Sequence, residues 1–262
     1  MNKKIEWKEL LLPYEQVVQE LKVKFKSIRS QYREMNEYSP IEFVTGRVKK
    51  ISSIKEKAIK KEISFDMIEE FIDDIAGIRI MCQFVDDIYD VVELIRKRDG
   101  YDLSIMYEKD YIKHSKESGY KSYHIIIKYP VYTIFGKQNV LAEIQIRTLA
   151  MNFWATIEHS LNYKYKSKMP DELKERLKRA AVSATNLDTE MMSIKNEIID
   201  AQLLFEIKSN LISEITSCID KLYELNYKEK AEYYEQKLDE YFNEGNICDI
   251  NKILNEIKEI LD

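Results

Sequence analysis

The sequence predicts an α+β fold, in which a mixed β-sheet flanked by helices is followed by a long C-terminal helical region. Two observations support this prediction. Between residues 41 and 147, short runs typical of strands alternate with short helical stretches, whereas apolar residues after Pro170 keep a helical spacing. The residues that break regular structure also divide the chain, because all four prolines and five of the six glycines precede residue 171.

The composition limits the class of protein. A chain of 262 residues can build one large or two modest domains without disulfides, and its three cysteines (Cys82, Cys218 and Cys248) form no metal-ligand pattern. The net charge of -5 excludes a general nucleic-acid binder, so any anion site must be local. No run of about 18 apolar residues and no signal peptide occurs, so we expect a cytoplasmic protein without membrane attachment.

The first helix is predicted to have Pro13 at its first position and to end before Ser39. Apolar side chains from Tyr14 to Tyr32 recur at intervals of three and four residues along it. The opposite face carries three basic residues one turn apart, Lys22, Lys26 and Arg29. This basic face is either an ordinary solvated surface or an anion site.

The central region is predicted to contain several strands and two helices. The expected strands are 41–49, 78–84, 101–107, 122–132 and 140–148, and the expected helices are 52–61 and 86–97. The last two strands should form an antiparallel hairpin that turns near Gly136. The polar segment 108–119 is expected to be a mobile substrate loop.

After Pro170 the chain is predicted to be nearly all helix. Apolar residues from Leu173 to Phe205 keep a strict four-three spacing, and as one helix they would span ~50 Å. A seam of that length requires a partner. Two further amphipathic helices are expected, one over 212–222 and a last one with Asp249 as its cap.

The strand 140–148 carries the first candidate site residues. Its alternation places Glu143, Gln145 and Arg147 on one face and apolar residues on the other. An acid, an amide and a base then share one row. A strand facing solvent produces the same pattern, so the neighbouring segments decide between the two interpretations.

A second acidic element precedes the strand at 78–84. Asp73 and Asp74 stand before Gly77, and a carboxylate at a strand edge, where a glycine relieves crowding, is a common place for Mg²⁺ to meet phosphate oxygens. Helix capping is the alternative role for such aspartates. It fits Asp86 and Asp87, which precede a helical stretch, better than it fits Asp74.

A basic cluster follows the first strand. Arg47 and Lys49 lie on one side of this strand, and Ser53 with Glu56 forms a capping box that opens a helix. The free N–H groups of that helix and Lys57 suit phosphate binding. Capping alone explains the serine and the glutamate, but it does not explain the adjoining cations.

Tyr120 lies among Lys116, Lys121 and His124, close to the last two strands. An exposed ring flanked by cations suits stacking on a base and pairing with its phosphates, although a buried strand tyrosine is the alternative. The helix after Thr148 then places Asn152, Thr156 and His159 on one face, where we interpret His159 as structural.

Five motifs now carry a resemblance. FVTGRVK, DDIAGIRI, SGYKSYH, EIQIRT and AMNFWATIEHSLNYKY, in this order, resemble the synthetase domain of the RelA/SpoT family, and most of all its small single-domain alarmone synthetases. The resemblance covers about residues 5 to 205. It implies a sheet of nucleotidyltransferase type, with an alarmone synthetase domain over 1–205 and a helical extension of unknown role over 206–262.

The resemblance implies a GTP/GDP pyrophosphokinase, or GTP diphosphokinase, of the stringent response. Such an enzyme uses Mg²⁺ to transfer pyrophosphate from ATP to the 3′-hydroxyl of GDP or GTP, which gives ppGpp or pppGpp and AMP. By this analogy Asp74 and Glu143 hold the metal, and Glu143 is also the base that activates the hydroxyl. No His-Asp dipeptide of the family's hydrolase domain occurs in the sequence, so we expect no hydrolase activity.

The resemblance also assigns both nucleotides. Arg47 and Arg79 would sandwich adenine, while Lys49, Ser53 and Lys57 would bind the triphosphate. The guanosine nucleotide would stack on Tyr120, and its other predicted contacts are Lys109, Lys116, Lys121, His124, Gln145 and Asn152. Lys121 departs from the arginine that many relatives carry, which puts the preference between GDP and GTP in question.

Small relatives are ring-like homotetramers with an allosteric alarmone site, so the resemblance implies pppGpp as an effector and single-stranded RNA as a further regulator. The matching allosteric residues are Lys22, Lys26, Arg29, Glu42, Phe43 and Thr45. Two other classes stay open at this point. One is a different nucleotidyltransferase on the same scaffold, and the other is a non-catalytic nucleotide- or RNA-binding scaffold built on the helical seam.

Overall fold

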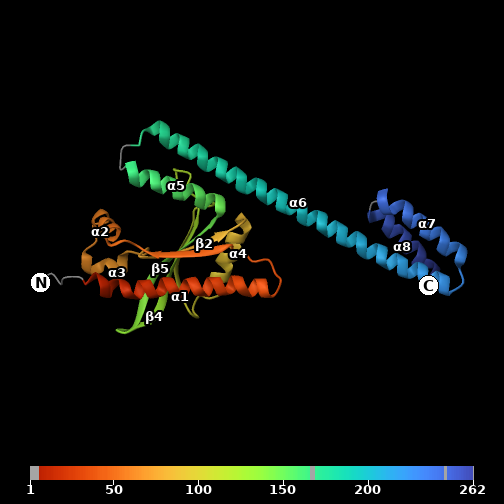
Figure 1. The fold of residues 1–262 in the computed structure, drawn as a ribbon, viewed down its shortest axis with the longest axis horizontal. Coiled ribbons are helices and arrows are strands. Elements are labelled where there is room, and N and C mark those ends of the chain that lie inside the picture. Colours follow the sequence, from red (N-terminus) through yellow and green to blue (C-terminus); the bar gives the residue numbers. More distant parts are fainter. Residues whose placement is uncertain (1–5, 166–168, 245–246, 262) are drawn as a thin grey trace. The chain divides into compact units, whose positions relative to one another are not determined.

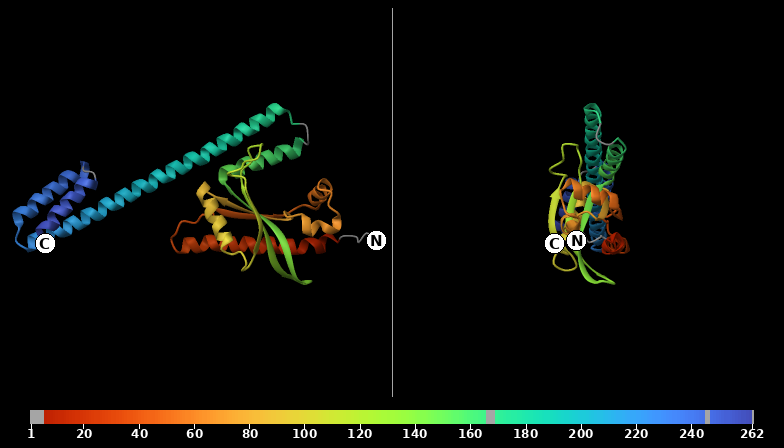
Figure 2. Two further views of the ribbon diagram at one scale, coloured as in Figure 1. Left: turned by 180° about the vertical axis from the view of Figure 1, so that it is seen from behind. Right: turned by 90° about the vertical axis from the view of Figure 1, so that its left-hand side faces the viewer.

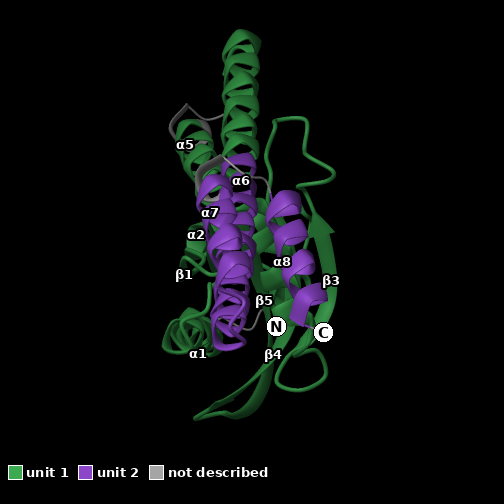
Figure 3. Cartoon of the chain, turned by 90° about the vertical axis from the view of Figure 1, so that its right-hand side faces the viewer, with its two compact units in different colours: residues 1–192 green, residues 193–262 purple. Residues whose placement is uncertain are grey.

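The computed structural model describes residues 6–165, 169–244 and 247–261. The chain forms two compact units, residues 1–192 and residues 193–262 (Figure 3). The boundary between them falls inside one long helix. The predicted division into a synthetase domain over 1–205 and an extension over 206–262 stays a prediction.

A mixed five-stranded sheet forms the centre of the first unit (Figure 1). Its strands are β1 (Phe43–Val48), β2 (Ala76–Cys82), β3 (Ser104–Asp110), β4 (Tyr123–Thr133) and β5 (Gly136–Thr148). The order across the sheet is β1-β2-β5-β4-β3, and only the pairing of β2 with β5 is parallel. The predicted hairpin is confirmed, since β4 and β5 pair antiparallel and Thr133 lies opposite Gly136.

The helices of the first unit are α1 (Trp7–Glu34), α2 (Ile51–Lys60), a 3-10 turn (Phe65–Met67), α3 (Ile68–Phe71), α4 (Val85–Arg96), α5 (Leu149–Tyr165) and the start of α6 (Asp171–Glu224). The helix α1 covers the apolar face of this sheet, and α5 borders its other face. Figures 1 and 2 show α1 lying along the sheet, and its residues Val17, Leu21 and Phe25 are fully buried in the core. None of the described helices is long and apolar enough to cross a membrane.

The first helix differs from the prediction at its start and ends before Ser39 as predicted. It begins at Trp7, so Pro13 lies inside α1 and not at its first position. It ends at Glu34, because Asn36 adopts a left-handed conformation (φ 56°) and the N–H of Glu37 bonds back to the carbonyl of Tyr32. A left-handed residue followed by an N–H that bonds back to the last turn satisfies carbonyls at the end of a helix.

One predicted helix cap is wrong and another is right. Lys50 is the N-cap of α2, and Ser53 is the third residue of that helix, so the proposed capping box of Ser53 and Glu56 does not form. The Asp87 carboxylate accepts hydrogen bonds from the Phe84 N–H (2.9 Å) and the Tyr38 hydroxyl (2.7 Å). Asp87 therefore caps α4 as the sequence predicted.

The predicted seam after Pro170 is one helix, but it extends further than expected. α6 continues to Glu224, so the stretch 212–222 belongs to it and is not a separate helix. The helix α7 (Lys228–Glu244) was not predicted, and Asp249 lies in the first turn of α8 (Ile247–Leu261), paired with Lys252. The second unit has its own buried core, formed by Ile215, Cys218, Ile219, Leu222, Ala231, Tyr234, Leu238, Ile250, Ile253, Leu254 and Ile257.

Gly46 in β1 allows α1 to approach the sheet closely. A Cβ built on Gly46 would lie 2.8 Å from Ile78 Cδ1 and 3.0 Å from Val18 Cγ1. Gly77 is different, because a Cβ there would meet only the Arg47 carbonyl oxygen at 3.7 Å. The expectation that Gly77 relieves crowding is therefore wrong, and of the two glycines it is Gly46 whose surroundings are crowded.

We predict that Gly46→Ala lowers the free energy of unfolding of the first unit by about 1–3 kcal/mol, because the added methyl forces packed side chains apart. Gly77→Ala is the matched control and should change it by less than about 0.5 kcal/mol. Both tryptophans, Trp7 and Trp154, lie in the first unit, so their fluorescence during chemical denaturation reports on that unit. Equal destabilisation by the two variants would contradict this account.

Candidate active site

The register of the sheet aligns polar residues in a row across all five strands. Directly paired positions point to the same face. One such row consists of Thr45, Arg79, Gln145, His124 and Lys109. On the opposite face of β5, Ala142, Ile144 and Ile146 are fully buried, so the predicted division of this strand into a polar and an apolar face is confirmed.

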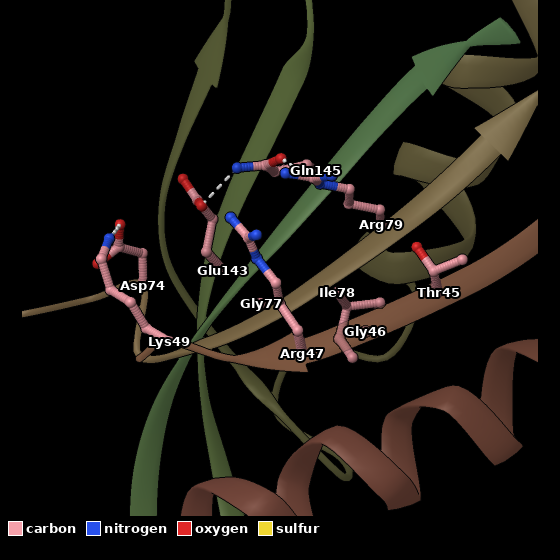
Figure 4. A pocket seen from close by; sticks show the side chains of 10 residues that line it. All are labelled: Thr45, Gly46, Arg47, Lys49, Asp74, Gly77, Ile78, Arg79, Glu143 and Gln145. Carbon is pink, nitrogen blue, oxygen red and sulfur yellow. Dashed lines mark hydrogen bonds and ion pairs between the residues drawn. The ribbon is translucent and has the colours of Figure 1, made fainter. Parts of the chain in front are cut away.

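Two adjoining cavities lie on this polar face, with volumes of about 220 and 500 Å³. Both are lined by Arg47, Lys49, Asp74, Arg79, Glu143 and Gln145. Figure 4 shows these side chains projecting from β1, β2, β5 and the segments directly after β1 and before β2. The two carboxylates predicted to act together, Asp74 and Glu143, therefore share one space.

Two lysines hold the Asp74 carboxylate. Lys49 Nζ donates to Asp74 Oδ2 at 2.5 Å, and Lys57 Nζ lies 2.9 Å from Asp74 Oδ1 in an ion pair that lacks hydrogen-bond geometry. Burial raises the pKa of Asp74, but the hydrogen bond from Lys49 and the positive charges of both lysines more than offset burial and hold this pKa below its ordinary value. Asp74 is ionised at neutral pH.

His124 holds the Glu143 carboxylate. His124 Nδ1 lies 2.9 Å from Glu143 Oε1, and the Gln145 amide donates to Glu143 Oε2 at 2.7 Å. Burial raises the pKa of Glu143. The hydrogen bond and charge of His124 and the hydrogen bond of Gln145 lower it by more, so this pKa lies below its ordinary value. Glu143 therefore enters any reaction as a carboxylate.

Tyr120 and Arg147 form the far side of the second cavity. The Tyr120 hydroxyl lies 2.8 Å from His124 Nε2 and accepts from Arg147 Nη2 at 2.5 Å. Two cations flank the ring, with Lys116 Nζ 4.9 Å and Arg147 Cζ 5.1 Å from its centre. Arg147 also donates to the Gln145 amide oxygen at 2.6 Å, so Arg147 fixes both Tyr120 and Gln145.

Arg47 and Arg79 approach the same cavity from neighbouring strands. Arg79 Nε donates to Gln145 Oε1 at 3.2 Å. Burial lowers the pKa of Arg79, and the nearby charges of Arg147 and Arg47 lower it further. Because these guanidinium groups repel one another, the cavity favours an anionic or electron-rich planar ligand between them.

The two carboxylates fit a magnesium site that is completed by substrate. Mg²⁺ is usually held by one or two carboxylates together with substrate phosphates and water. Asp74 and Glu143 supply the oxygen ligands, and Asp74 lies close enough to Glu143 for its charge to raise the pKa of Glu143. No cluster of three or more His, Cys, Asp or Glu residues suited to a metal occurs among the described residues.

Some of the predicted nucleotide-binding residues line the two cavities, and others do not. Tyr120, Lys116, His124 and Gln145 line the second cavity. Of the described residues, Lys109, Lys121, Asn152, Ser53 and Lys57 lie outside the lining of both cavities, although Lys57 contacts Asp74 directly.

The predicted contacts outside the lining have other neighbours. Lys109 belongs to the polar row but rests on the Tyr107 ring, 4.8 Å from its centre. Lys121 lies near Asp188 of α6. Burial raises the pKa of Asp188, and the positive charge of Lys121 partly lowers it again. The expected loop 108–119 also begins later than predicted, because β3 continues to Asp110 and carries Lys109.

The two cavities on the polar face do not bring the six predicted allosteric residues together. Arg29 Nη2 lies 3.5 Å from Glu42 Oε1, and Lys22 runs beside Gly46 on the side of β1 that faces α1. Thr45 instead lines the first cavity. Phe43 and Lys26 are exposed.

Sequence reasoning assigned no role to several residues at the site. Arg147, Thr156 and His159 line the second cavity, where His159 is exposed and not structural as expected. The alternation of β5 already placed Arg147 on the polar face beside Glu143 and Gln145, so the sequence could have identified it as a site residue. Asp73 and Tyr107 meet through a hydrogen bond that no local pattern in the sequence indicates.

Comparisons with known proteins identify the family. The RelA_SpoT model, a region found in RelA / SpoT proteins, matches residues 46–168. GTP pyrophosphokinase YjbM of Bacillus subtilis is 54% identical over 203 residues, which are 78% of this chain and 95% of that protein. A solved GTP pyrophosphokinase family protein from Streptococcus pneumoniae is 56% identical, with a TM-score of 0.71 over 77% of this chain and 98% of that one.

A third relative has been solved with ligands. The small alarmone synthetase 1 of Bacillus subtilis bound to its product pppGpp is 54% identical, with a TM-score of 0.70 over 74% of this chain and 98% of its own. Bound to AMPCPP, the same synthetase is 51% identical, with a TM-score of 0.65 over 74% of this chain and 98% of its own. From the polar row, the shared cavity and these likenesses, we conclude that the chain belongs to the RelA/SpoT family and is similar to its small alarmone synthetases.

Proposed function

We propose that this chain transfers pyrophosphate from ATP to the 3′-hydroxyl of GDP or GTP, giving ppGpp or pppGpp and AMP. The observation that carries the proposal is that Asp74 and Glu143 line both adjoining cavities and lie between two groups of cations. The relatives named as GTP pyrophosphokinases, and the synthetase bound to pppGpp, support the same reaction. Both substrates are cytoplasmic metabolites, so we expect the chain to act in the cytoplasm.

The cations beside β1 and β2 form the proposed ATP site. Arg47 and Arg79 offer planar groups for the adenine, and the relative bound to the ATP analogue AMPCPP supports a nucleotide at an equivalent site. Lys49 and Lys57 contact the carboxylate of Asp74. When ATP binds, their ammonium groups can leave this carboxylate and pair with phosphate oxygens. Ser53 lies one turn before Lys57 on α2, so both residues face the same side of that helix.

The cations around Tyr120 form the proposed guanosine site. Lys116 and Arg147 flank the Tyr120 ring, so guanine stacking requires one of these cations to move toward a phosphate. Gln145 and His124 lie beside the ring in the same cavity. Lys109, Lys121 and Asn152 stay predicted contacts that require movement toward the cavity.

The reaction requires the 3′-oxygen to attack the β-phosphorus of ATP while AMP leaves. Mg²⁺ bound at Asp74 and Glu143 would neutralise phosphate charge and favour loss of the hydroxyl proton. Glu143 accepts that proton, and His124 and Gln145 keep its carboxylate aimed into the cavity. Tyr120 holds the acceptor base, so the hydroxyl and the carboxylate meet in one place.

The product assay tests this function. Labelled ATP, Mg²⁺ and GDP should give AMP and a 3′-pyrophosphorylated guanosine, and Glu143→Gln should lower turnover by about 10²–10⁴-fold because the proton acceptor is lost. The exposed Glu37→Gln is the control and should behave like the wild type. If GDP, GTP and GMP all fail to yield such a product, the chain is a different nucleotidyltransferase; if Glu143→Gln keeps full turnover, the role of Glu143 is wrong.

The pairing of Asp74 with two lysines predicts opposite effects of one variant. Asp74→Asn should lower magnesium-dependent turnover by at least about 10²-fold, because a metal ligand is lost. The same variant should bind ATP in the presence of EDTA about three- to tenfold more tightly, because a negative charge near the triphosphate is removed and the lysines are released. Calorimetry and the product assay measure the two effects. Weaker ATP binding in EDTA would contradict the proposed exchange.

We further propose a homotetramer that pppGpp activates and that single-stranded RNA regulates. Exposed apolar residues of α6 in the second unit, including Ile194, Ile198 and Phe205, support contact with another copy. Lys26 belongs to the proposed effector site, so Lys26→Ala should keep the basal rate and reduce activation by added pppGpp at least about threefold. Arg33→Ala, an exposed cation on the same helix, is the control. An undiminished response in Lys26→Ala would exclude this effector site.

A further inference from the structure

Asp73 occupies a position for which neither the sequence nor the proposed mechanism gives a role. It is the residue before Asp74, at the entrance to β2. Its Oδ1 accepts from Lys57 Nζ at 3.1 Å, and its Oδ2 accepts from the Tyr107 hydroxyl. Only 22% of its side chain is exposed. A half-buried carboxylate with both oxygens engaged has a fixed orientation.

Tyr107 comes from the opposite edge of the sheet. It lies in β3, whereas Asp73 precedes β2, and the strands β5 and β4 separate β2 from β3. Tyr107 pairs with Ile126 and so belongs to the row of Arg47, Gly77 and Glu143 on the cavity face. Its side chain therefore lies on that face, where burial together with the Asp73 carboxylate raises the pKa of Tyr107 and keeps the hydroxyl a donor.

Lys57 is held between two neighbouring carboxylates. Its Nζ lies 3.1 Å from Asp73 Oδ1 and 2.9 Å from Asp74 Oδ1. The proposed function assigns Asp74 to the metal, and a carboxylate that binds a cation attracts a lysine less strongly. Lys57 then needs a second anion to keep its ammonium group beside the cavity, and Asp73 is in place to supply it.

We propose that Asp73, fixed by Tyr107, is a positioning residue that keeps Lys57 at the triphosphate side of the cavity when Asp74 is engaged by Mg²⁺. This inference rests on the proposed function, because it assigns the ATP phosphates to Lys57. It concerns ATP binding alone, since Asp73 contacts Lys57 and Tyr107 and stands apart from the residues around Tyr120.

Steady-state kinetics of four variants tests the proposal. Asp73→Asn should raise KM for ATP about tenfold, the effect of losing one charge-assisted hydrogen bond. KM for GDP and kcat should stay within about twofold. Tyr107→Phe should raise KM for ATP less, by about threefold. In a Lys57→Ala background, Asp73→Asn should have no further effect on KM for ATP, because the two residues act through one contact.

The control is Asp66→Asn, which removes an exposed carboxylate from the neighbouring 3-10 turn and should leave every constant unchanged. Tryptophan fluorescence during denaturation monitors folding of the first unit in each variant. If the contact between Asp73 and Tyr107 only stabilises the fold, the variants should have a lower free energy of unfolding while KM for ATP and KM for GDP stay unchanged. That result would overturn the proposal. An additive effect of Asp73→Asn on top of Lys57→Ala would overturn it as well.

These outcomes separate the inference from the function on which it rests. The wild type reports on the function, because it either forms the pyrophosphorylated guanosine or does not. If the wild type forms this product while Asp73→Asn and Tyr107→Phe keep KM for ATP within twofold, the positioning role fails and the function stands. If the wild type forms no such product, the proposed function is wrong, and the inference that rests on it is wrong as well.

Discussion

The parallel pairing of β2 with β5 is the constraint on which the rest of the site depends. It sets Gly77 opposite Glu143 and Arg79 opposite Gln145, so Asp74, just before β2, comes to the same cavity as Glu143. A slip of one residue would turn Glu143 into the apolar core and expose its neighbours. Fully buried isoleucines on the other face of β5 therefore fix the register of the chemistry as well as the fold.

Charge balance within the cavity explains how an acidic protein offers a polyphosphate site. Each cavity carboxylate has its own cationic or hydrogen-bonding partner, namely Lys49 and Lys57 for Asp74 and His124 for Glu143. Arrival of a metal with a nucleotide would exchange these partners, with the metal taking the carboxylates and the phosphates taking the lysines. The side chains are thus held in place before the substrates bind, which lowers the cost of organising them for the reaction.

Periodicity predicted more of this molecule than local motifs did. The alternation of β5 identified both its faces, and the four-three spacing identified α6, because burial imposes these periods directly. The cap assigned to Ser53 was wrong by a few residues, since several polar residues near a helix start compete for that position. The contact between Asp73 and Tyr107 depends on the order of strands, which no local pattern carries.

The central claim is that Asp74 and Glu143 serve one metal-bound polyphosphate. A crystal structure with AMPCPP and Mn²⁺ tests it most directly, because anomalous scattering locates the metal without reference to the protein. We predict a manganese peak within about 2.0–2.6 Å of oxygens from both carboxylates and from the nucleotide phosphates. Manganese bound to the phosphates but touching neither carboxylate would contradict the account.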